Sequence, residues 1–406
     1  MKNSKNPKIE FNSTTVGLKV LKKELNKTKI LEKIDKLCPK LSGYSVSKIF
    51  TASIFKNILN VPTYTQTQEE FMETPEFECL ANRTTLGRNI QRLGKLENYN
   101  CILLTLVIFI ITTFKILSHN IRIVIDGTTI EVSKKSKYEG VDWVWDNAQG
   151  KNVWGYEVTI IALTFEGIYI PVYFEIGEMK KSKILKILIE LKTIFNTNKI
   201  LFDGGYASDS FYEKLTENGF IFYTKVAKNW LFNNGLTENI ETIKNKVVFS
   251  KNEKYYTIKA FREKKGKTTD VSYSLCFKKN DPRVILTNDL SENVAEKAFN
   301  EFFKRWDIET CNDELKDNFC FEKLPIRNLD GIIGYLLSCF VAMILMVLIK
   351  IKFKDKLGNL FNKGFKKIIR FIILVKAKWK SWKKLDKLLF RVDFKFKWFY
   401  EHYGLA

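Results

Sequence analysis

The sequence predicts a mixed α/β protein in three parts, and three observations support this division. Up to residue 118, apolar side chains recur at the three- and four-residue spacing typical of helices. From Ile121, short apolar runs alternate with helical stretches. The last 56 residues, 351–406, are rich in lysine and aromatic residues. We therefore expect an all-α N-terminal domain (1–118), a mixed-sheet α/β core (119–350) and a basic α-helical C-terminal segment (351–406).

The N-terminal domain is expected to contain several short helices. The helical patterns cover residues 18–37, 44–59 and 84–96, and Pro39 and Pro62 follow the first two. Arg88, Arg92 and Lys95 fall on one face of the third helix. This arrangement resembles a helix-turn-helix DNA-binding domain. A solvated basic face in a lysine-rich protein explains the same pattern, and both interpretations stay open.

The core shows a defined order of elements. Strands are predicted at 121–126, 156–165, 168–176, 199–202 and 220–226, and helices at 181–195 and 208–219. This β-β-β-α-β-α-β order predicts a mixed sheet with helices packed on it. Short β-type runs separated by polar turns then predict a β-rich insertion at 230–286, after which a helix resumes near Ser291.

One apolar run, Gly331–Ile349, spans 19 residues without a charge. Its length suits a transmembrane helix, but a helix buried on all sides in a soluble core has the same composition. The first residues, MKNSKNPKIEFN, contain no apolar signal-peptide region.

The chain is strongly basic, with 67 Lys and Arg against 45 Asp and Glu. The resulting charge of +22 favours nucleic acid or an anionic membrane as partner, although lysine-rich usage also arises in A/T-rich genomes. Seven scattered cysteines without a C-x-x-C pair exclude a disulfide framework or zinc knuckle, and two histidines exclude a His-rich metal centre. Reduced thiols in the cytoplasm are expected.

The candidate chemistry rests on carboxylates at strand ends. Asp126-Gly127 follows the first predicted strand, and Asp203-Gly204 follows the fourth. Such a carboxylate suits a metal ligand, although Asp-Gly is also an ordinary turn. In the helix after the insertion, Phe302, Arg305, Glu309 and Lys316 are spaced 3, 4 and 7 residues apart, on one face. Such a face suits metal and phosphate binding, or simple salt-bridge pairing in solvent.

Together these motifs resemble the D-D-E transposases of bacterial insertion sequences, in the cut-and-paste group with the Y-R-E-K signature. Asp-Gly-Thr and Asp-Gly-Gly stand where that family has its two aspartates. The signature falls on Phe302, Arg305, Glu309 and Lys316, with phenylalanine in place of the family's tyrosine. The resemblance covers roughly residues 120–350. It implies an RNase-H-like core and places the apolar run inside a soluble core rather than in a membrane.

The resemblance also implies a mechanism. Asp126, Asp203 and Glu309 would be the catalytic carboxylates and would bind two Mg²⁺ or Mn²⁺ ions, which oxygen ligands suit. Arg305, Lys316 and the residue at Phe302 would contact DNA phosphates. The implied activity is excision of an insertion sequence at terminal inverted repeats of double-stranded DNA, followed by strand transfer, by a homodimer that pairs two ends. A cytoplasmic, nucleoid-associated location follows.

Three alternatives stay open. The first is a catalytically inactive, DNA-binding descendant of such a transposase, which the missing tyrosine hydroxyl suggests. The second is a membrane protein with a basic tail, and the third is an RNase-H-like nuclease acting on RNA or hybrids. Second-choice ligands are Glu131, Asp142, Asp146 and Asp209, and tryptophans able to stack on DNA are Trp143, Trp145, Trp154 and Trp230.

Overall fold

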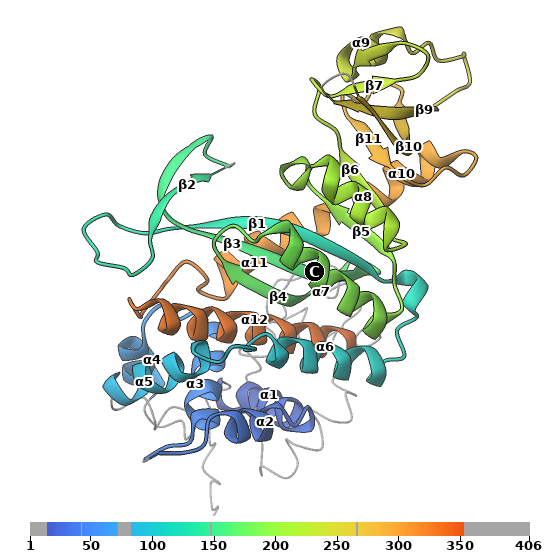
Figure 1. Cartoon of the computed structure of the whole chain (residues 1–406). Coiled ribbons are helices and arrows are strands. Elements are labelled where there is room, and N and C mark those ends of the chain that lie inside the picture. Colours follow the sequence, from blue (N-terminus) through green and yellow to red (C-terminus); the bar gives the residue numbers. More distant parts are fainter. Residues whose placement is uncertain (1–13, 42, 72–82, 147, 265–266, 353–406) are drawn as a thin grey trace, which may run out of the picture.

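The computed structural model describes residues 14–41, 43–71, 83–146, 148–264 and 267–352 (Figure 1). In this part of the chain, helices pack around one large mixed sheet. The predicted basic segment lies outside the described residues from residue 353 onward.

The N-terminal part is helical, as predicted. Its helices are α1 (Thr14–Lys27), α2 (Ile30–Leu37), α3 (Val46–Ile58), α4 (Tyr64–Phe71), α5 (Arg83–Gly94) and α6 (Cys101–Thr113). On α5, Arg92 donates to the carbonyl of Pro39 at 2.7 Å. Lys95, just beyond α5, lies 3.9 Å from the Asp330 carboxylate. Two of the three cations on the predicted basic face thus contact the rest of the molecule, and the helix-turn-helix interpretation stays a prediction.

The core strands follow the short turn η2 (Ser118–Asn120). They are β1 (Arg122–Glu131), β2 (Asp142–Asp146), β3 (Lys151–Phe165), β4 (Ile168–Ile176), β5 (Lys199–Phe202) and β6 (Ile221–Lys225). Helix α7 (Lys181–Phe195) leads to β5, and the turn η3 (Gly204–Tyr206) and α8 (Asp209–Glu217) lead to β6. The β3–β4 hairpin is confirmed: Glu166 and Gly167 both have positive φ, as the tightest hairpin turns require.

The first strand is longer than predicted. Residues 127–131 continue to pair with β3, so β1 runs past Asp126 to Glu131 instead of ending in a turn there. The antiparallel partner supplies hydrogen bonds beyond the point where the parallel partner β5 stops. Asp126 therefore lies on a strand held on both sides up to its own position.

The predicted insertion is β-rich and continues the same sheet. It contains β7 (Leu231–Asn233), β8 (Thr237–Asn239), β9 (Tyr255–Lys264), β10 (Lys267–Lys278) and β11 (Val284–Thr287), with one short helix, α9 (Ile240–Lys246). Strand β11 pairs antiparallel with β6, and the sheet order is β2-β3-β1-β5-β6-β11-β10-β9-β7-β8, with β4 beside β3. The insertion therefore extends away from the core at the β6 edge (Figure 1).

The helix predicted after Ser291 is divided in two, which corrects the single uninterrupted helix face. Helix α10 (Val294–Phe303) and helix α11 (Trp306–Asn318) meet at Lys304 and Arg305. There the Lys304 and Arg305 N–H groups bond three residues back, to Glu301 and Phe302, in a tighter turn than an α-helix. Phe302 thus belongs to α10, whereas Glu309 and Lys316 belong to α11.

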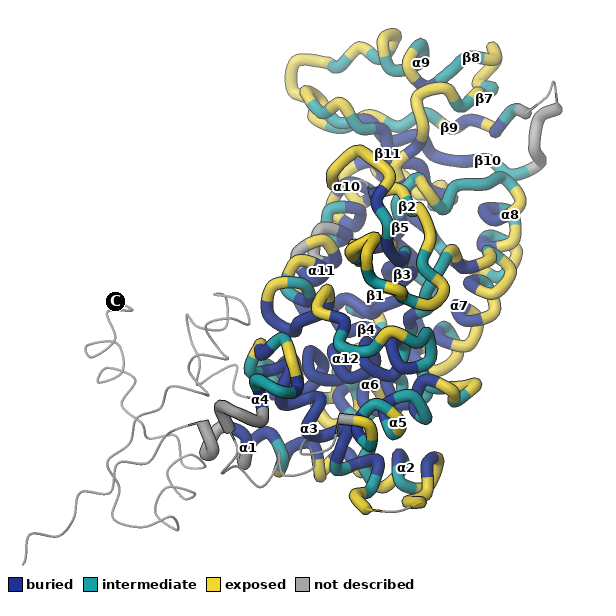
Figure 2. Tube along the Cα trace, turned by 90° about the vertical axis from the view of Figure 1, so that its left-hand side faces the viewer, coloured by how far each residue is buried: buried dark blue, intermediate teal, exposed yellow. Residues whose placement is uncertain are grey.

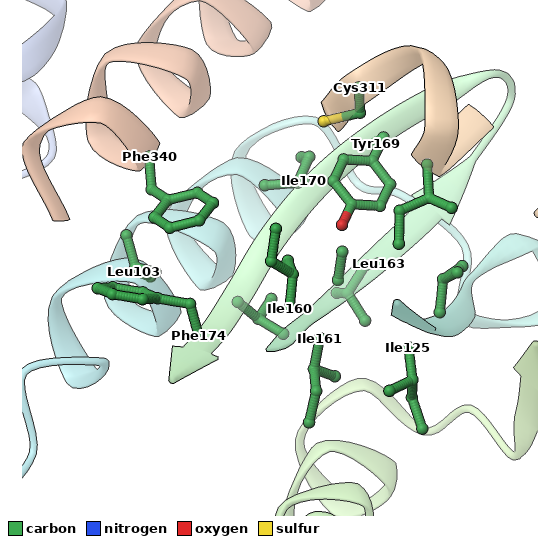
Figure 3. Close-up of a cluster of buried hydrophobic side chains, with 14 of the residues drawn as sticks. Leu103, Ile125, Ile160, Ile161, Leu163, Tyr169, Ile170, Phe174, Cys311 and Phe340 are labelled. Carbon is green, nitrogen blue, oxygen red and sulfur yellow. The ribbon is translucent and has the colours of Figure 1, made fainter. Parts of the chain in front are cut away.

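The long apolar run forms α12 (Leu329–Lys352), which is long and apolar enough to span a membrane. However, 94% of its most apolar window is buried within the molecule. Helices α3, α5 and α6 and strand β4 pack around it, and Figure 2 shows it as dark blue throughout its central part. Phe340 of α12 stacks near Phe174 of β4 with ring centres 4.7 Å apart, beside Leu103 of α6 (Figure 3). This burial favours a core helix.

Candidate active site

Two of the predicted carboxylates lie on neighbouring parallel strands. Strands β1 and β5 pair in register at Ile123–Ile200, Val124–Leu201 and Ile125–Phe202. Asp126 and Asp203 are the next residues on the two strands. Because parallel strands lie about 4.8 Å apart, equivalent positions at the end of the shared ladder bring the two aspartates side by side. Asp203 is followed by the tight turn η3, which ends β5 at this level.

Helix α11 brings further polar side chains to the same place. It packs against β1 and β4, with Cys311 on the same side of the strands as Tyr169 (Figure 3). The side-chain amide of Asn312 donates to Oδ2 of Asp126 at 3.1 Å. Arg305, which precedes α11, donates to Glu309 Oε1 at 2.7 Å. The C-terminal end of the β1–β5 pair therefore carries Asp126 and Asp203, and α11 brings Arg305 and Glu309 towards it.

The electrostatics of Asp126 support this convergence. The pKa of Asp126 is raised to about 6, chiefly by burial and to a smaller extent by the charges of Asp203 and Glu309, against the opposing effects of Arg305 and the Gly127 N–H. Like charges held this close disfavour ionisation, because each carboxylate repels the others. A shift of this kind, caused by burial and by two named carboxylates, is typical of a functional site.

The remaining two signature positions lie apart from the carboxylates. Phe302 is only 2% exposed and packs in the hydrophobic core, with the Arg305 guanidinium 5.3 Å from its ring centre. Its ring therefore supports Arg305 from within the core. Lys316 lies two helical turns beyond Glu309 and forms an ion pair with Glu322 at 3.1 Å. Its side chain is 26% exposed, so its ammonium group is accessible to a ligand along the helix.

Sequence reasoning missed three polar residues around Asp126. Asn312 stands three residues after Glu309, on the same helix face, and this spacing was the available signal. Tyr206 lies three residues after Asp203, and its pKa is raised by burial and by the nearby charge of Asp126. Tyr169 is fully buried, and the same two causes, with Cys311, raise its pKa. No sequence pattern placed Tyr169 here.

The second-choice acids are engaged in local contacts. Asp209 binds Arg262 at 3.0 Å, and Asp146 accepts from the Gln149 N–H at 2.8 Å. Glu131 accepts from the Gln149 side chain, and Asp142 accepts from the Trp143 N–H.

Of the tryptophans, Trp230 lies under Arg262 at 4.1 Å and beside Tyr212. Trp143 and Trp145 are exposed on β2, and Trp154 meets Trp143 edge-on.

The three carboxylates fit a divalent cation by their chemistry. All are oxygen ligands, and a bound cation would offset the cost of ionising Asp126, which burial and the neighbouring carboxylates disfavour. As the side chains are placed, no three His, Cys, Asp or Glu groups among the described residues converge on one point. Glu309 is instead paired with Arg305, so it would have to change partner or share its two oxygens to reach a cation.

Comparison with known proteins identifies the family. Residues 118–345 match the model of the transposase DDE domain, a range that contains both aspartates, Arg305 and Glu309. No curated protein sequence matches the chain. Among solved structures, the Drosophila P element transposase strand transfer complex is similar, with 14% identity and a TM-score of 0.26. That match covers 56% of this chain and 55% of that chain, about half of its length. By the family match, which spans more than half of its residues, the chain belongs to the transposase DDE domain family.

Proposed function

We propose that this protein is a DNA transposase of a bacterial insertion sequence, of the cut-and-paste group with the Y-R-E-K signature. The observation that carries the proposal is the parallel β1–β5 pairing that brings Asp126 and Asp203 side by side, within a chain of the transposase DDE domain family. The charge of Glu309 on α11 also acts on Asp126. The parallel β1–β5–β6 strands with antiparallel β3 and β4 beside them support an RNase-H-like core.

In this proposal Asp126, Asp203 and Glu309 hold two Mg²⁺ or Mn²⁺ ions. Bound ions would supply an activated water or DNA 3′-hydroxyl and would stabilise the leaving oxygen of an in-line displacement at phosphorus. Arg305 and Lys316 bind phosphates of the DNA end, Arg305 through its planar guanidinium and Lys316 as a point charge. Phe302 supports Arg305 from the core side, since the Arg305 guanidinium lies 5.3 Å from the centre of its buried ring.

The proposed partners and location follow from charge and chemistry. A net charge of +22 attracts double-stranded DNA, both transposon ends and target. A homodimer would pair two ends, and the protein would act in the cytoplasm, associated with the nucleoid.

A cleavage assay tests the proposal. Purified full-length protein is incubated with Mg²⁺ and DNA carrying the sequences that flank its own gene. We expect cuts at defined positions from the wild type and none from Asp126→Asn. Glu190→Gln, which changes an exposed carboxylate on α7, should cut like the wild type.

Two results would separate the alternatives. Binding of the flanking DNA without cleavage would favour the inactive, DNA-binding descendant, and Phe302→Tyr would then be tested for restored cutting. Neither binding nor cleavage would overturn the proposed function.

A further inference from the structure

The first site carboxylate has a partner that the motif does not contain. Asn312 lies on α11, and its Nδ2 donates to Oδ2 of Asp126 at 3.1 Å across 186 residues of sequence. An ionised carboxylate only accepts hydrogen bonds, so the amide must present its NH₂ group to Asp126 and leave its carbonyl oxygen elsewhere. That oxygen, Oδ1 of Asn312, is buried and has no hydrogen-bond partner within the protein.

Three buried polar atoms without hydrogen-bond partners belong to side chains that interact with Asp126. Besides Asn312 Oδ1, they include Nε of Arg305 and the hydroxyl of Tyr169. Both of these side chains interact electrostatically with Asp126. Leaving a buried polar atom unpaired costs about 1–3 kcal/mol, and native proteins seldom accept that cost without a functional reason. Three such atoms beside one carboxylate indicate a shell shaped for a charged or hydrated ligand.

The position of Asn312 on α11 links two site carboxylates. Glu309 and Asn312 are three residues apart, so they project from the same face of one helix. Glu309 contributes a carboxylate of its own, whereas Asn312 holds one that belongs to β1. The helix thereby fixes the orientation of Asp126 relative to Glu309. Without the amide, Asp126 would lose the hydrogen bond that holds Oδ2, and repulsion from Asp203 and Glu309 would act against fewer restraints.

We propose that Asn312 is a positioning residue, which fixes one oxygen of Asp126 so that the other is directed to the divalent cation of the site. The inference rests on the proposed function, because it assumes a cation at these carboxylates. Asn312 contributes orientation, and loss of a residue in this role typically weakens metal binding about 10- to 100-fold.

Metal binding, measured without DNA, tests the role directly. Mn²⁺ is titrated into the full-length protein and followed by calorimetry and by the electron paramagnetic resonance signal of free Mn²⁺. Asn312→Leu keeps the shape of the side chain and removes both polar atoms, and Asn312→Ala is the second variant. The matched control is Asn318→Ala, because Asn318 lies on the same helix and both asparagines are 7% exposed.

We expect both Asn312 variants to bind Mn²⁺ at least about 10-fold more weakly than the wild type. The thermal unfolding midpoint in EDTA, which a merely structural role would lower, should stay close to that of the Asn318→Ala control. Unchanged Mn²⁺ affinity in both variants would overturn the inference. Equal weakening by Asn318→Ala would also overturn it, because the effect would then be general destabilisation.

The same experiment separates this inference from the proposed function. Wild-type protein that binds no Mn²⁺, or binds it equally well after Asp126→Asn, would contradict the metal-dependent function itself. Wild-type protein that binds Mn²⁺ through Asp126, with Asn312 variants that bind it equally well, would refute the role of Asn312 alone.

Discussion

The guanidinium of Arg305 donates to the Glu309 carboxylate at 2.7 Å, one helical turn away. Arg305 is buried, whereas the Glu309 side chain is 52% exposed. The pair places a fixed positive charge beside the carboxylates that are proposed to hold metal ions. Arg305 therefore offsets the negative charge of those carboxylates and also competes with the proposed cation for Glu309.

Replacing Arg305 should separate metal binding from DNA cleavage. We expect Arg305→Gln to bind Mn²⁺ up to about fivefold more tightly, because a half-exposed ion pair is worth at most about 1 kcal/mol. DNA cleavage should fall sharply, since the phosphate-binding cation is lost. Calorimetry and the cleavage assay measure the two effects. Arg283→Gln breaks a similar 2.7 Å pair with Asp281 in the insertion and should change neither. Weaker Mn²⁺ binding by Arg305→Gln would contradict this account.

Glu301 should make the stability of the fold depend on acid pH. Burial by itself raises the pKa of Glu301, but hydrogen bonds from Arg122 at 2.6 and 2.7 Å and the Lys304 charge lower it to about 2. A lowered carboxylate pKa stabilises the folded state above the unfolded value of 4.5. This contribution, about 3 kcal/mol, is lost as the pH falls from about 4.5 towards 2.

Urea unfolding across this pH range measures the effect. Glu301→Gln should unfold more easily at pH 7 and should lose part of the decline in stability that the wild type shows in acid. Glu296→Gln, an exposed position on the same helix, should follow the wild-type curve. A Glu301→Gln curve parallel to that of the wild type at every pH would rule out this origin of the acid sensitivity.

The crossing of α5 and α12 should tolerate no side chain at Gly334. A Cβ added there would lie 2.1 Å from the Ile90 carbonyl oxygen, which belongs to the backbone of α5. We expect Gly334→Ala to lower the free energy of unfolding by about 1–3 kcal/mol or more, because the helices must separate. Gly87 on α5 has open space around it, so Gly87→Ala should instead stabilise the protein by about 0.5–1 kcal/mol. Denaturant titration of both variants checks the pair, and equal effects would refute the close crossing.

Lys316 should contribute one phosphate contact. Because each neutralised phosphate releases counterions, Lys316→Ala should reduce the slope of log affinity against log salt by about 1. Fluorescence anisotropy with a labelled DNA duplex at several salt concentrations gives this slope. Lys297→Ala, at a residue ion-paired with Asp289 at 2.6 Å, is the control and should leave the slope unchanged. An unchanged slope for Lys316→Ala would place Lys316 away from the DNA.

Helix α12 should behave as a core helix in fractionation. Since 94% of its most apolar window is buried by the protein itself, little apolar surface is left to contact lipid. We expect high-salt and alkaline carbonate washes to release the protein from any membrane pellet. Retention in the pellet after both washes would instead support the transmembrane interpretation of Gly331–Ile349.

Local sequence patterns were sufficient to predict several secondary-structure elements and the candidate site carboxylates of this protein. The alternation of apolar residues predicted the β3–β4 hairpin and its turn at Glu166-Gly167, and the three- to four-residue spacing predicted α3 and α7. These features depend on contacts between residues close in sequence, so a single sequence contains the information for them. The two Asp-Gly pairs and the spacing of Arg305 and Glu309 likewise marked the candidate site before its geometry was known.

The tertiary structure decided what depends on distant partners. Strand β1 continues past Asp126 because β3 pairs with it, and α12 is buried because α3, α5 and β4 cover it. The bonds of Asn312 to Asp126 and of Arg122 to Glu301 join residues 186 and 179 positions apart. No local periodicity encodes such pairs. They form only when the sheet order and helix packing bring their backbones together. Sequence patterns therefore predicted the candidate carboxylates, whereas only the tertiary structure shows that Asn312 hydrogen-bonds to Asp126 and Arg122 to Glu301.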